Sequence, residues 1–291
     1  MPQTWLITGS SSGFGRELVE QLLARGDRVA ATLRRPEALA DLAEAHGDRL
    51  WVRALDVTDT ARLRAVVDEA FADLGRIDVV VSNAGYGLIG AAEELSDEQL
   101  TRQLDTNVVG SLQLARAVLP HLRAQGGGRI LQLSSIGGIV GFPGGSLYHA
   151  SKWAVEGFFE ALRTEVAPFG IETCLVEPGS ARTRFSRGSL DLAPRLDAYA
   201  GTALDHVRQI VATRTDAEIP GDPAKMVAAM IGAADADALP PRLLLGSDAY
   251  SLAHAALTAR LAFVEAQRDI ALATDADDYA DTGAGLASIE R

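Results

Sequence analysis

Tyr148 and Lys152 are the residues in this sequence whose types and spacing most clearly indicate a chemical role. They stand four positions apart in a segment with helical periodicity, so both side chains lie on one helix face. A free tyrosine has a pKa of about 10, and a nearby ammonium group lowers that pKa because it favours the phenolate. The pair therefore predicts a proton donor and acceptor for neutral pH. Alone the spacing is weak, because any exposed helix can offer these two residues.

A glycine-rich turn near the N-terminus gives that pair a context. The run Thr8-Gly9-Ser10-Ser11-Ser12-Gly13-Phe14-Gly15 follows an apolar, strand-like segment and opens a helix. Glycines allow a tight turn and a close approach of the backbone to a ligand. The helix N-terminus offers unpaired N–H groups and the positive end of its dipole to a pyrophosphate. The turn therefore predicts a dinucleotide site, with an ordinary Gly-Ser loop as the alternative.

The glycine spacing Thr-Gly-x-x-x-Gly-x-Gly and the Tyr-x-x-x-Lys pair resemble those of the short-chain dehydrogenases/reductases, nearest to the hydroxysteroid and retinol dehydrogenase branch. The motifs occur in family order over roughly residues 4–246. The resemblance implies an oxidoreductase that moves a hydride between a nicotinamide and a carbonyl or alcohol carbon. It also implies a cofactor site, whose residues are Gly9, Ser11, Ser12, Gly13, Phe14, Gly15, Asp56, Val57, Asn83, Ala84, Gly85, Tyr148, Lys152, Pro178, Gly179 and Thr183.

The same resemblance assigns four catalytic positions, Asn107, Ser135, Tyr148 and Lys152. Tyr148 transfers the proton, while Ser135 hydrogen-bonds the substrate oxygen and stabilises the charge that develops there. The family most often places its serine thirteen residues before the tyrosine, which selects Ser135 and leaves Ser134 as a packing or cofactor contact. Asn107 resembles the residue that distorts its helix to bind a water linking Lys152 to solvent. Asp56 has an alternative use as a turn residue or helix cap.

The end of the second strand-like segment indicates which dinucleotide is bound. NAD-binding enzymes usually carry an acidic residue there to hold the ribose hydroxyls, whereas this chain has Leu33 followed by Arg34 and Arg35. A guanidinium can form bidentate bonds to the additional phosphate of NADP. We therefore expect NADP(H), with Leu33 and Arg34 at the site, and a Leu33→Asp change is expected to narrow or reverse the preference. Alternatively, the two arginines are solvent-exposed residues at the start of a helix that follows at Pro36.

Apolar runs of strand length, separated by segments of helical periodicity, must position these residues. They lack polar alternation, which indicates strands covered on both faces, as in a parallel sheet between two helical layers. The predicted fold class is α/β, a doubly wound Rossmann fold with a seven-stranded parallel sheet and a C-terminal helical extension. The runs are Trp5–Thr8, Arg28–Thr32, Leu50–Ala54, Val79–Ser82, Arg129–Leu133, Glu172–Val176 and Arg242–Leu245.

Two regions depart from this alternation. Residues 180–222 are rich in Arg, Asp, Pro and Gly, and they stand where a loop over the active site is expected. We therefore predict a single domain over residues 1–247 that includes this substrate-binding segment, followed by a helical extension over residues 248–291. Within the extension, Thr274–Asp281 is acidic and small, which predicts a frayed end.

Composition narrows the class of partner. The formal charge of -12 opposes binding to nucleic acid or to an anionic membrane. No apolar run reaches about 18 residues, and no charged leader precedes the first strand, so we expect a cytoplasmic protein. Cys174 is the single cysteine and lies in an apolar run, where a small buried hydrophobe is expected. The five histidines show no metal-site spacing, so no metal is predicted.

The expected substrate is a small-molecule carbonyl or alcohol compound with a bulky apolar group. The expected assembly is a homodimer or homotetramer. An apolar wall is predicted from Leu88, Ile89, Ile139, Val140, Phe142, Phe185 and Leu190. The helices near Ser96–Leu119 and Tyr148–Val166 correspond to the family's usual dimer surface. Rival hypotheses are a catalytically silent NADP-binding regulator, which typically loses the tyrosine or lysine retained here, and a nucleotide-sugar epimerase, whose glycine spacing and longer C-terminal domain are missing.

Overall fold

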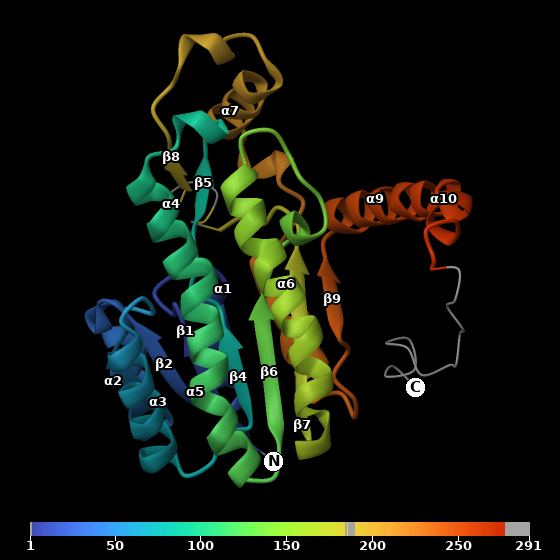
Figure 1. Ribbon diagram of the computed structural model, residues 1–291. Coiled ribbons are helices and arrows are strands. Elements are labelled where there is room, and N and C mark those ends of the chain that lie inside the picture. Colours follow the sequence, from blue (N-terminus) through green and yellow to red (C-terminus); the bar gives the residue numbers. More distant parts are fainter. Residues whose placement is uncertain (1, 184, 186–189, 277–291) are drawn as a thin grey trace. The chain divides into compact units, whose positions relative to one another are not determined.

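The computed structural model describes residues 2–183, 185 and 190–276, and its centre is a parallel sheet of seven strands. The strand order is β3-β2-β1-β4-β6-β7-β9, the order of a doubly wound sheet (Figure 1). The predicted fold is therefore confirmed. The strands are β1 Thr4–Thr8, β2 Arg28–Leu33, β3 Leu50–Ala54, β4 Val79–Ser82, β6 Gly128–Leu133, β7 Ile171–Pro178 and β9 Arg242–Leu245.

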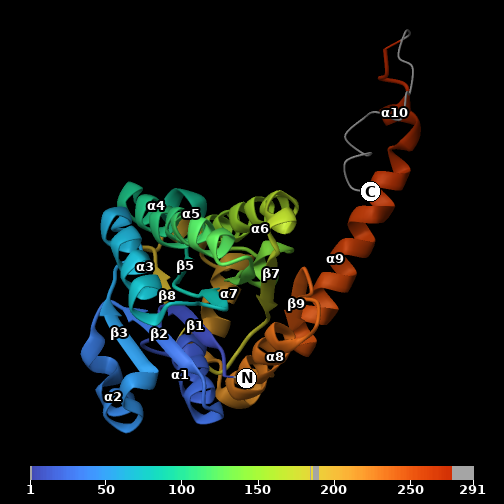
Figure 2. The ribbon, with the colours of Figure 1, turned by 90° about the horizontal axis from the view of Figure 1, so that it is seen from below.

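Helices cover both faces of the sheet. In Figure 2, α3, α5 and α6 lie on one side of the strands, and α1 and α8 lie on the other. The helices are α1 Gly13–Arg25, α2 Ala40–His46, α3 Thr60–Leu74, α4 Asp97–Leu104, α5 Gly110–Ala124, α6 Ser146–Val166, α7 Ala203–Thr213, α8 Pro223–Asp235, α9 Ser247–Ala266 and α10 Arg268–Leu272. Helix α1 ends at Gly26, a C-cap with φ of 99°, a conformation that favours glycine.

The absence of polar alternation in the strands has a direct structural cause. Along β1, the side chains of Trp5 and Ile7 join the core packed under α1 and α8, while Leu6 joins the core under α3, α5 and α6. Successive side chains of a strand point to opposite faces, so a strand buried on both faces is apolar at every position. The strands are thereby held between two separate cores.

A second sheet was not expected from the sequence. It pairs β5 Gly87–Ile89 with β8 Leu190–Leu192 in parallel. The pairing joins the segment after β4 to a part of residues 180–222. Three residues are too few for periodicity to indicate a strand. This pairing holds residues 190–192 of the predicted substrate-binding segment against the segment that follows β4.

The chain divides into two compact units, Met1–Ala253 and His254–Arg291, and the division falls inside α9. In the second unit the large apolar side chains of α9 and α10 are exposed; Phe263 is 68% accessible and Ile270 is 71% accessible. The predicted frayed segment Thr274–Asp281 lies largely outside the described residues. No helix in the described part of the chain is long and apolar enough to cross a membrane.

Candidate active site

The glycine-rich turn between β1 and α1 forms a tight cradle. Gly9 has a φ of 71°, and a Cβ on Gly15 would lie 2.4 Å from the Gly9 carbonyl oxygen. The amide nitrogen of Asn83 donates to the carbonyls of Thr8 (2.9 Å) and Gly9 (3.1 Å), so the residues after β4 hold the turn in place. Only glycine fits at Gly15, because any side chain would displace this backbone.

The N-terminus of α1 fits an anionic ligand. Ser12 is the N-cap but makes no side-chain capping bond, and the first turn holds no acidic residue. The N–H groups and the positive dipole end are therefore available to a pyrophosphate. Phe14 packs against the core, and the Cβ of Thr183 lies 3.6 Å from the Cβ position of Gly13. The turn, together with Thr183 opposite it, could hold the phosphates of a dinucleotide.

The end of β2 corrects one expectation. Leu33 is only 2% exposed and belongs to the core, so its side chain cannot contact a ribose. Arg34 and Arg35 are exposed, and among the described residues neither side chain makes a hydrogen bond or ion pair. The guanidinium groups are thus free to meet an additional phosphate. A Leu33→Asp change would bury a charge in the core and would not test cofactor preference.

The remaining predicted cofactor residues follow the ends of neighbouring strands. Asp56 is exposed, and its Oδ1 accepts from the backbone N–H of Thr58 at 3.0 Å, which is the turn role weighed as its alternative. Val57 is buried against Gly110. Asn83, Ala84 and Gly85 follow β4, Ser11 lies in the glycine turn, and Pro178 and Gly179 close β7.

Tyr148 and Lys152 lie in the first two turns of α6, as predicted. The Lys152 ammonium is 5.8 Å from the centre of the Tyr148 ring and donates to the Leu133 carbonyl at 2.9 Å. Ser135 follows the end of β6, and its side chain acts on the Tyr148 phenol. The structure therefore brings serine, tyrosine and lysine together at the carboxyl end of the central strands, where doubly wound sheets bind ligands.

Burial governs the acidity of this group. It raises the pKa of Tyr148 to about 12, although the Ser135 hydrogen bond opposes the rise. In the protein without a nicotinamide, desolvation of the phenolate outweighs the influences that favour ionisation. The lowering expected beside a bound oxidised nicotinamide stays a prediction. Burial also lowers the pKa of Lys152 to about 8, and the charge of Glu156 opposes that change. The lysine can thus change its charge near neutral pH.

Asn107 lies in a π-helical turn, Asp105–Val109, between α4 and α5. Such turns interrupt regular helical bonding and are frequent at functional sites. The Asn107 amide donates to the Tyr86 carbonyl at 2.9 Å and to the Ser151 hydroxyl at 3.2 Å, while its oxygen accepts from the Tyr86 N–H at 3.1 Å. The side chain joins the segment after β4 to the helix that carries Lys152.

His149, the residue after Tyr148, packs within the site. Its Nδ1 lies 3.0 Å from the Gly137 carbonyl oxygen, and its Nε2 accepts from the Phe142 backbone N–H at 3.1 Å. This arrangement requires the proton on Nδ1, and burial lowers the pKa of His149, which favours the neutral ring. His149 therefore braces the loop between Ser135 and Tyr148. Its place beside Tyr148 in the sequence did not indicate this role.

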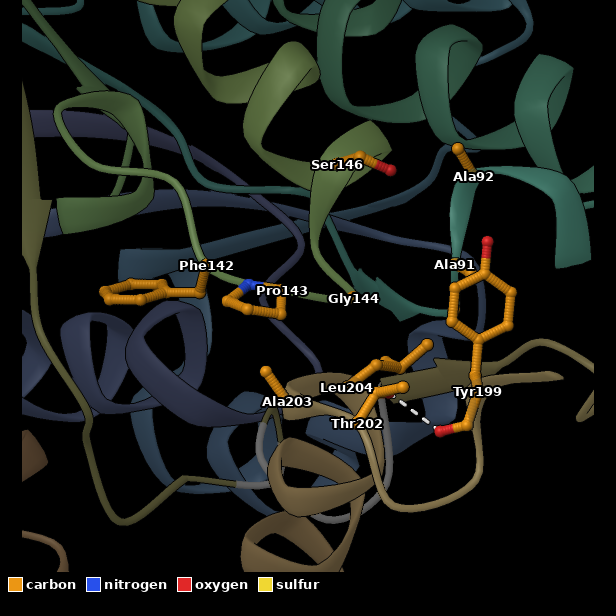
Figure 3. A pocket seen from close by; sticks show the side chains of 11 residues that line it. Ala91, Ala92, Phe142, Pro143, Gly144, Ser146, Tyr199, Thr202, Ala203 and Leu204 are labelled. Atoms are coloured by element: carbon orange, nitrogen blue, oxygen red, sulfur yellow. Dashed lines mark hydrogen bonds between the residues drawn. The ribbon is translucent and has the colours of Figure 1, made fainter.

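A cavity of about 370 Å³ opens beside this loop. Figure 3 shows Phe142, Pro143 and Gly144 on one side and Thr202, Ala203 and Leu204 on the other. The predicted substrate-binding segment, residues 180–222, therefore meets the loop around Phe142, and Gly90 also lines the cavity. Most residues of the predicted apolar wall do not line this cavity. Leu88, Ile139 and Val140 are buried packing residues, whereas Phe185 lies against the Tyr148 ring with 5.9 Å between ring centres.

A buried ion pair that the sequence did not indicate anchors one wall of the cavity. The Glu94 side chain is fully buried and pairs with Arg208 of α7 at 2.5 Å. Its oxygens also accept from the backbone N–H groups of Ala91 (2.6 Å) and Leu196 (2.8 Å). Although burial opposes ionisation, these bonds lower the pKa of Glu94 to about 2, so the carboxylate stays charged. The pair fastens α7 to the segment after β5.

Comparisons with known proteins agree with this geometry. A sequence model described as short chain dehydrogenase matches residues 3–191. Oxidoreductase BOA17 from Botryotinia fuckeliana is 38% identical over 276 residues, covering 94% of this chain and 100% of the relative. The 17-beta-hydroxysteroid dehydrogenase type 1 of Homo sapiens is also 38% identical, over 62% of this chain and 57% of its own length.

Solved structures show the same similarity. A short-chain dehydrogenase from Streptomyces avermitilis has a TM-score of 0.87 and 41% identity, covering 94% of this chain and 98% of that one. A short chain dehydrogenase from Burkholderia cenocepacia J2315, solved in complex with NADP, has a TM-score of 0.71 and 25% identity, covering 90% and 95% respectively. The arrangement of strands and helices is therefore that of proteins that bind a nicotinamide dinucleotide.

Proposed function

This chain belongs to the short-chain dehydrogenase/reductase family of NAD(P)-binding oxidoreductases, and from that premise we propose that it uses NADP(H) to interconvert a ketone and a secondary alcohol. One observation carries the proposal. Ser135, Tyr148 and Lys152 meet at the carboxyl end of the sheet. The cradle formed by Gly9, Gly15 and the start of α1 lies at the same edge.

In the reducing direction Tyr148 acts as the general acid. Its Oη–H donates a proton to the carbonyl oxygen, while the Ser135 hydroxyl donates a hydrogen bond to that oxygen and stabilises its developing charge. When bound, NADPH supplies the hydride that reduces the carbonyl carbon, and NADP⁺ accepts one in the reverse direction. The Lys152 ammonium stabilises the phenolate that remains. Burial of Tyr148 favours the neutral phenol, which is the proton-donating form.

NADP(H) is proposed over NAD(H) from the end of β2. Position 33 is a leucine, so it offers no carboxylate to the ribose of a ligand. The exposed guanidinium groups of the next two residues are suited to binding a phosphate. The NADP complex of the Burkholderia relative supports the same choice. Thr183, Asn83 and the start of α1 would hold the rest of the dinucleotide.

The substrate is proposed to be bulky and apolar. Phe142, Pro143, Ala203 and Leu204 line the cavity beside the catalytic loop, and such a lining favours an apolar group over a charged one. The ring of Phe185 on Tyr148 adds apolar surface next to the reacting position. A panel of ketones of increasing size, followed through NADPH absorbance at 340 nm, tests the proposal.

The expected result of the panel is turnover that rises with apolar bulk and is absent for small charged keto acids. Binding of NADPH is checked separately by fluorescence titration. A protein that binds NADPH yet turns over none of the ketones, and none of the matching alcohols with NADP⁺, would instead be the silent NADP-binding regulator.

A further inference from the structure

A buried carboxylate follows Lys152 by one helical turn. Glu156 lies four residues further along α6, so its side chain lies on the same helix face as that of Lys152. Glu156 is only 6% exposed, as is Lys152. Carboxylates are rarely buried unless they are paired. The proposed catalytic step assigns Glu156 no role, so its burial beside the lysine needs a separate reason.

Three more charged groups surround this carboxylate. The guanidinium of Arg242 on β9 lies 2.6 Å from Glu156 Oε2, and it also pairs with Glu177 near the end of β7. Glu177 is 1% exposed. Glu160, one turn beyond Glu156, reaches Arg242 at 3.3 Å but is 67% exposed. One guanidinium therefore serves two buried carboxylates, so Arg242 alone does not balance the negative charge of the pair.

The second oxygen of Glu156, Oε1, is not the one that pairs with Arg242. Among the described residues, Oε1 of Glu156 is buried without a hydrogen-bond partner, and so is the Ser134 hydroxyl. Both atoms crowd Gly138, where a Cβ would lie 2.7 Å from Oε1 and 2.8 Å from the Ser134 oxygen. Glu156 thus lies under the loop that carries Ser135. No hydrogen bond from the described residues offsets the negative charge on Oε1, so this charge acts on neighbouring groups.

The titratable and charged groups around Lys152 and Glu156 come from three elements. Helix α6 supplies Tyr148 and Glu160, β7 supplies Cys174 and Glu177, and β9 supplies Arg242; β6 contributes the Leu133 carbonyl that accepts from the ammonium. Burial and the charge of Glu156 raise the pKa of Glu177 above its usual range. Glu156 is the group whose negative charge acts on Lys152.

We propose that the carboxylate of Glu156, held by Arg242 one helical turn beyond Lys152, is a positioning residue that keeps the Lys152 ammonium charged beside the Tyr148 phenol. The inference rests on the proposed function, because only there does the lysine charge matter for proton transfer. Glu156 acts through Lys152 and touches no reacting atom. Burial drives the lysine toward its neutral form, and the adjacent carboxylate opposes this effect.

The composition of the chain allows a direct test. The chain has two lysines, Lys152 and the exposed Lys225 of α8. Protein grown with lysine labelled with ¹³C at Cε therefore gives two side-chain NMR signals, and the exposed one serves as an internal reference. Titration of the ligand-free protein reads the pKa of Lys152 without any assay of turnover.

The decisive variant is Glu156→Gln, which keeps the shape of the side chain and leaves Arg242 paired with Glu177. The Lys152 titration is expected to move down by about one pH unit, the low end for loss of a nearby opposite charge. Glu160→Gln is the matched control, since it also removes a carboxylate from α6 and from Arg242, but an exposed one that contributes little. This control should leave the titration unmoved.

Either of two results would overturn the proposal. One is an unmoved Lys152 signal in a folded Glu156→Gln protein, and the other is an equal shift in both variants. Glu156→Asp keeps the negative charge, so the pKa of Lys152 should return most of the way to its value in the unaltered protein. If only the length of the Glu156 side chain mattered, this shorter variant would not bring the pKa back. In turnover assays, the fall of ketone reduction at alkaline pH should begin at lower pH in Glu156→Gln. A failure of the proposed function would abolish turnover in all variants but leave the NMR result intact.

Discussion

At the scale of single residues, type and spacing predict the positions of the proposed catalytic group, whereas burial sets its acidity. The positions of Ser135, Tyr148 and Lys152 follow from short motifs because the motifs encode a helix turn and a strand end. Their acidity does not, because desolvation depends on which segments cover them. Leu33 is a second case, since a strand buried on both faces hides its side chain in the core.

Arg34 is where cofactor preference is best tested. Removing its guanidinium in Arg34→Ser takes away charge-assisted hydrogen bonds worth about 1.5–3 kcal/mol each, so the KM for NADPH should rise roughly 10- to 100-fold. The KM for NADH should change little. Steady-state kinetics with both cofactors measure this difference, and Arg35→Ser measures the share that the second guanidinium contributes. Equal efficiency with NADPH and NADH in the unaltered protein would remove the NADP assignment.

At the scale of elements, the strands of the main sheet were predictable and the segments over its edge were not. Long apolar runs specify doubly covered strands, and the predicted limits of β3, β4 and β9 match those observed. The short strands β5 and β8 and the Glu94–Arg208 pair depend on contacts between residues about 100 positions apart. No local pattern carries such information, so the wall of the substrate cavity could be located only approximately.

The β1–α1 turn allows a test with a matched control. Gly15→Ala forces a methyl group to within 2.4 Å of the Gly9 carbonyl oxygen, so the turn must shift. We expect a stability loss of about 1–3 kcal/mol and at least a tenfold weaker NADPH affinity, roughly 1.4 kcal/mol. Gly157→Ala on α6 meets no atom within 4 Å and should stabilise the protein by roughly 0.5–1 kcal/mol. Urea unfolding and NADPH fluorescence measure both variants, and unchanged affinity in Gly15→Ala would contradict the assigned role of the turn.

At the scale of the whole molecule, the proposed assembly is a homodimer or homotetramer through α4, α5 and α6. Leu100 (43%), Val109 (39%) and Trp153 (46%) are exposed on or between these helices, although large apolar side chains are usually covered. Light scattering coupled to size-exclusion chromatography should give a mass of two or four chains. Trp153→Glu should shift that mass toward one chain, whereas a monomer in the unaltered protein at micromolar concentration would contradict the proposal.

The central claim concerns the proton carried by Tyr148, and Tyr148→Phe tests it most directly because it removes the hydroxyl and leaves the ring in place. With NADPH and the best ketone of the panel, kcat should fall about 100- to 10,000-fold, the usual contribution of a general acid. NADPH affinity, measured by fluorescence on the same preparation, should stay within about threefold, a change worth well under 1 kcal/mol. Undiminished turnover in a folded Tyr148→Phe protein that binds NADPH would contradict the account.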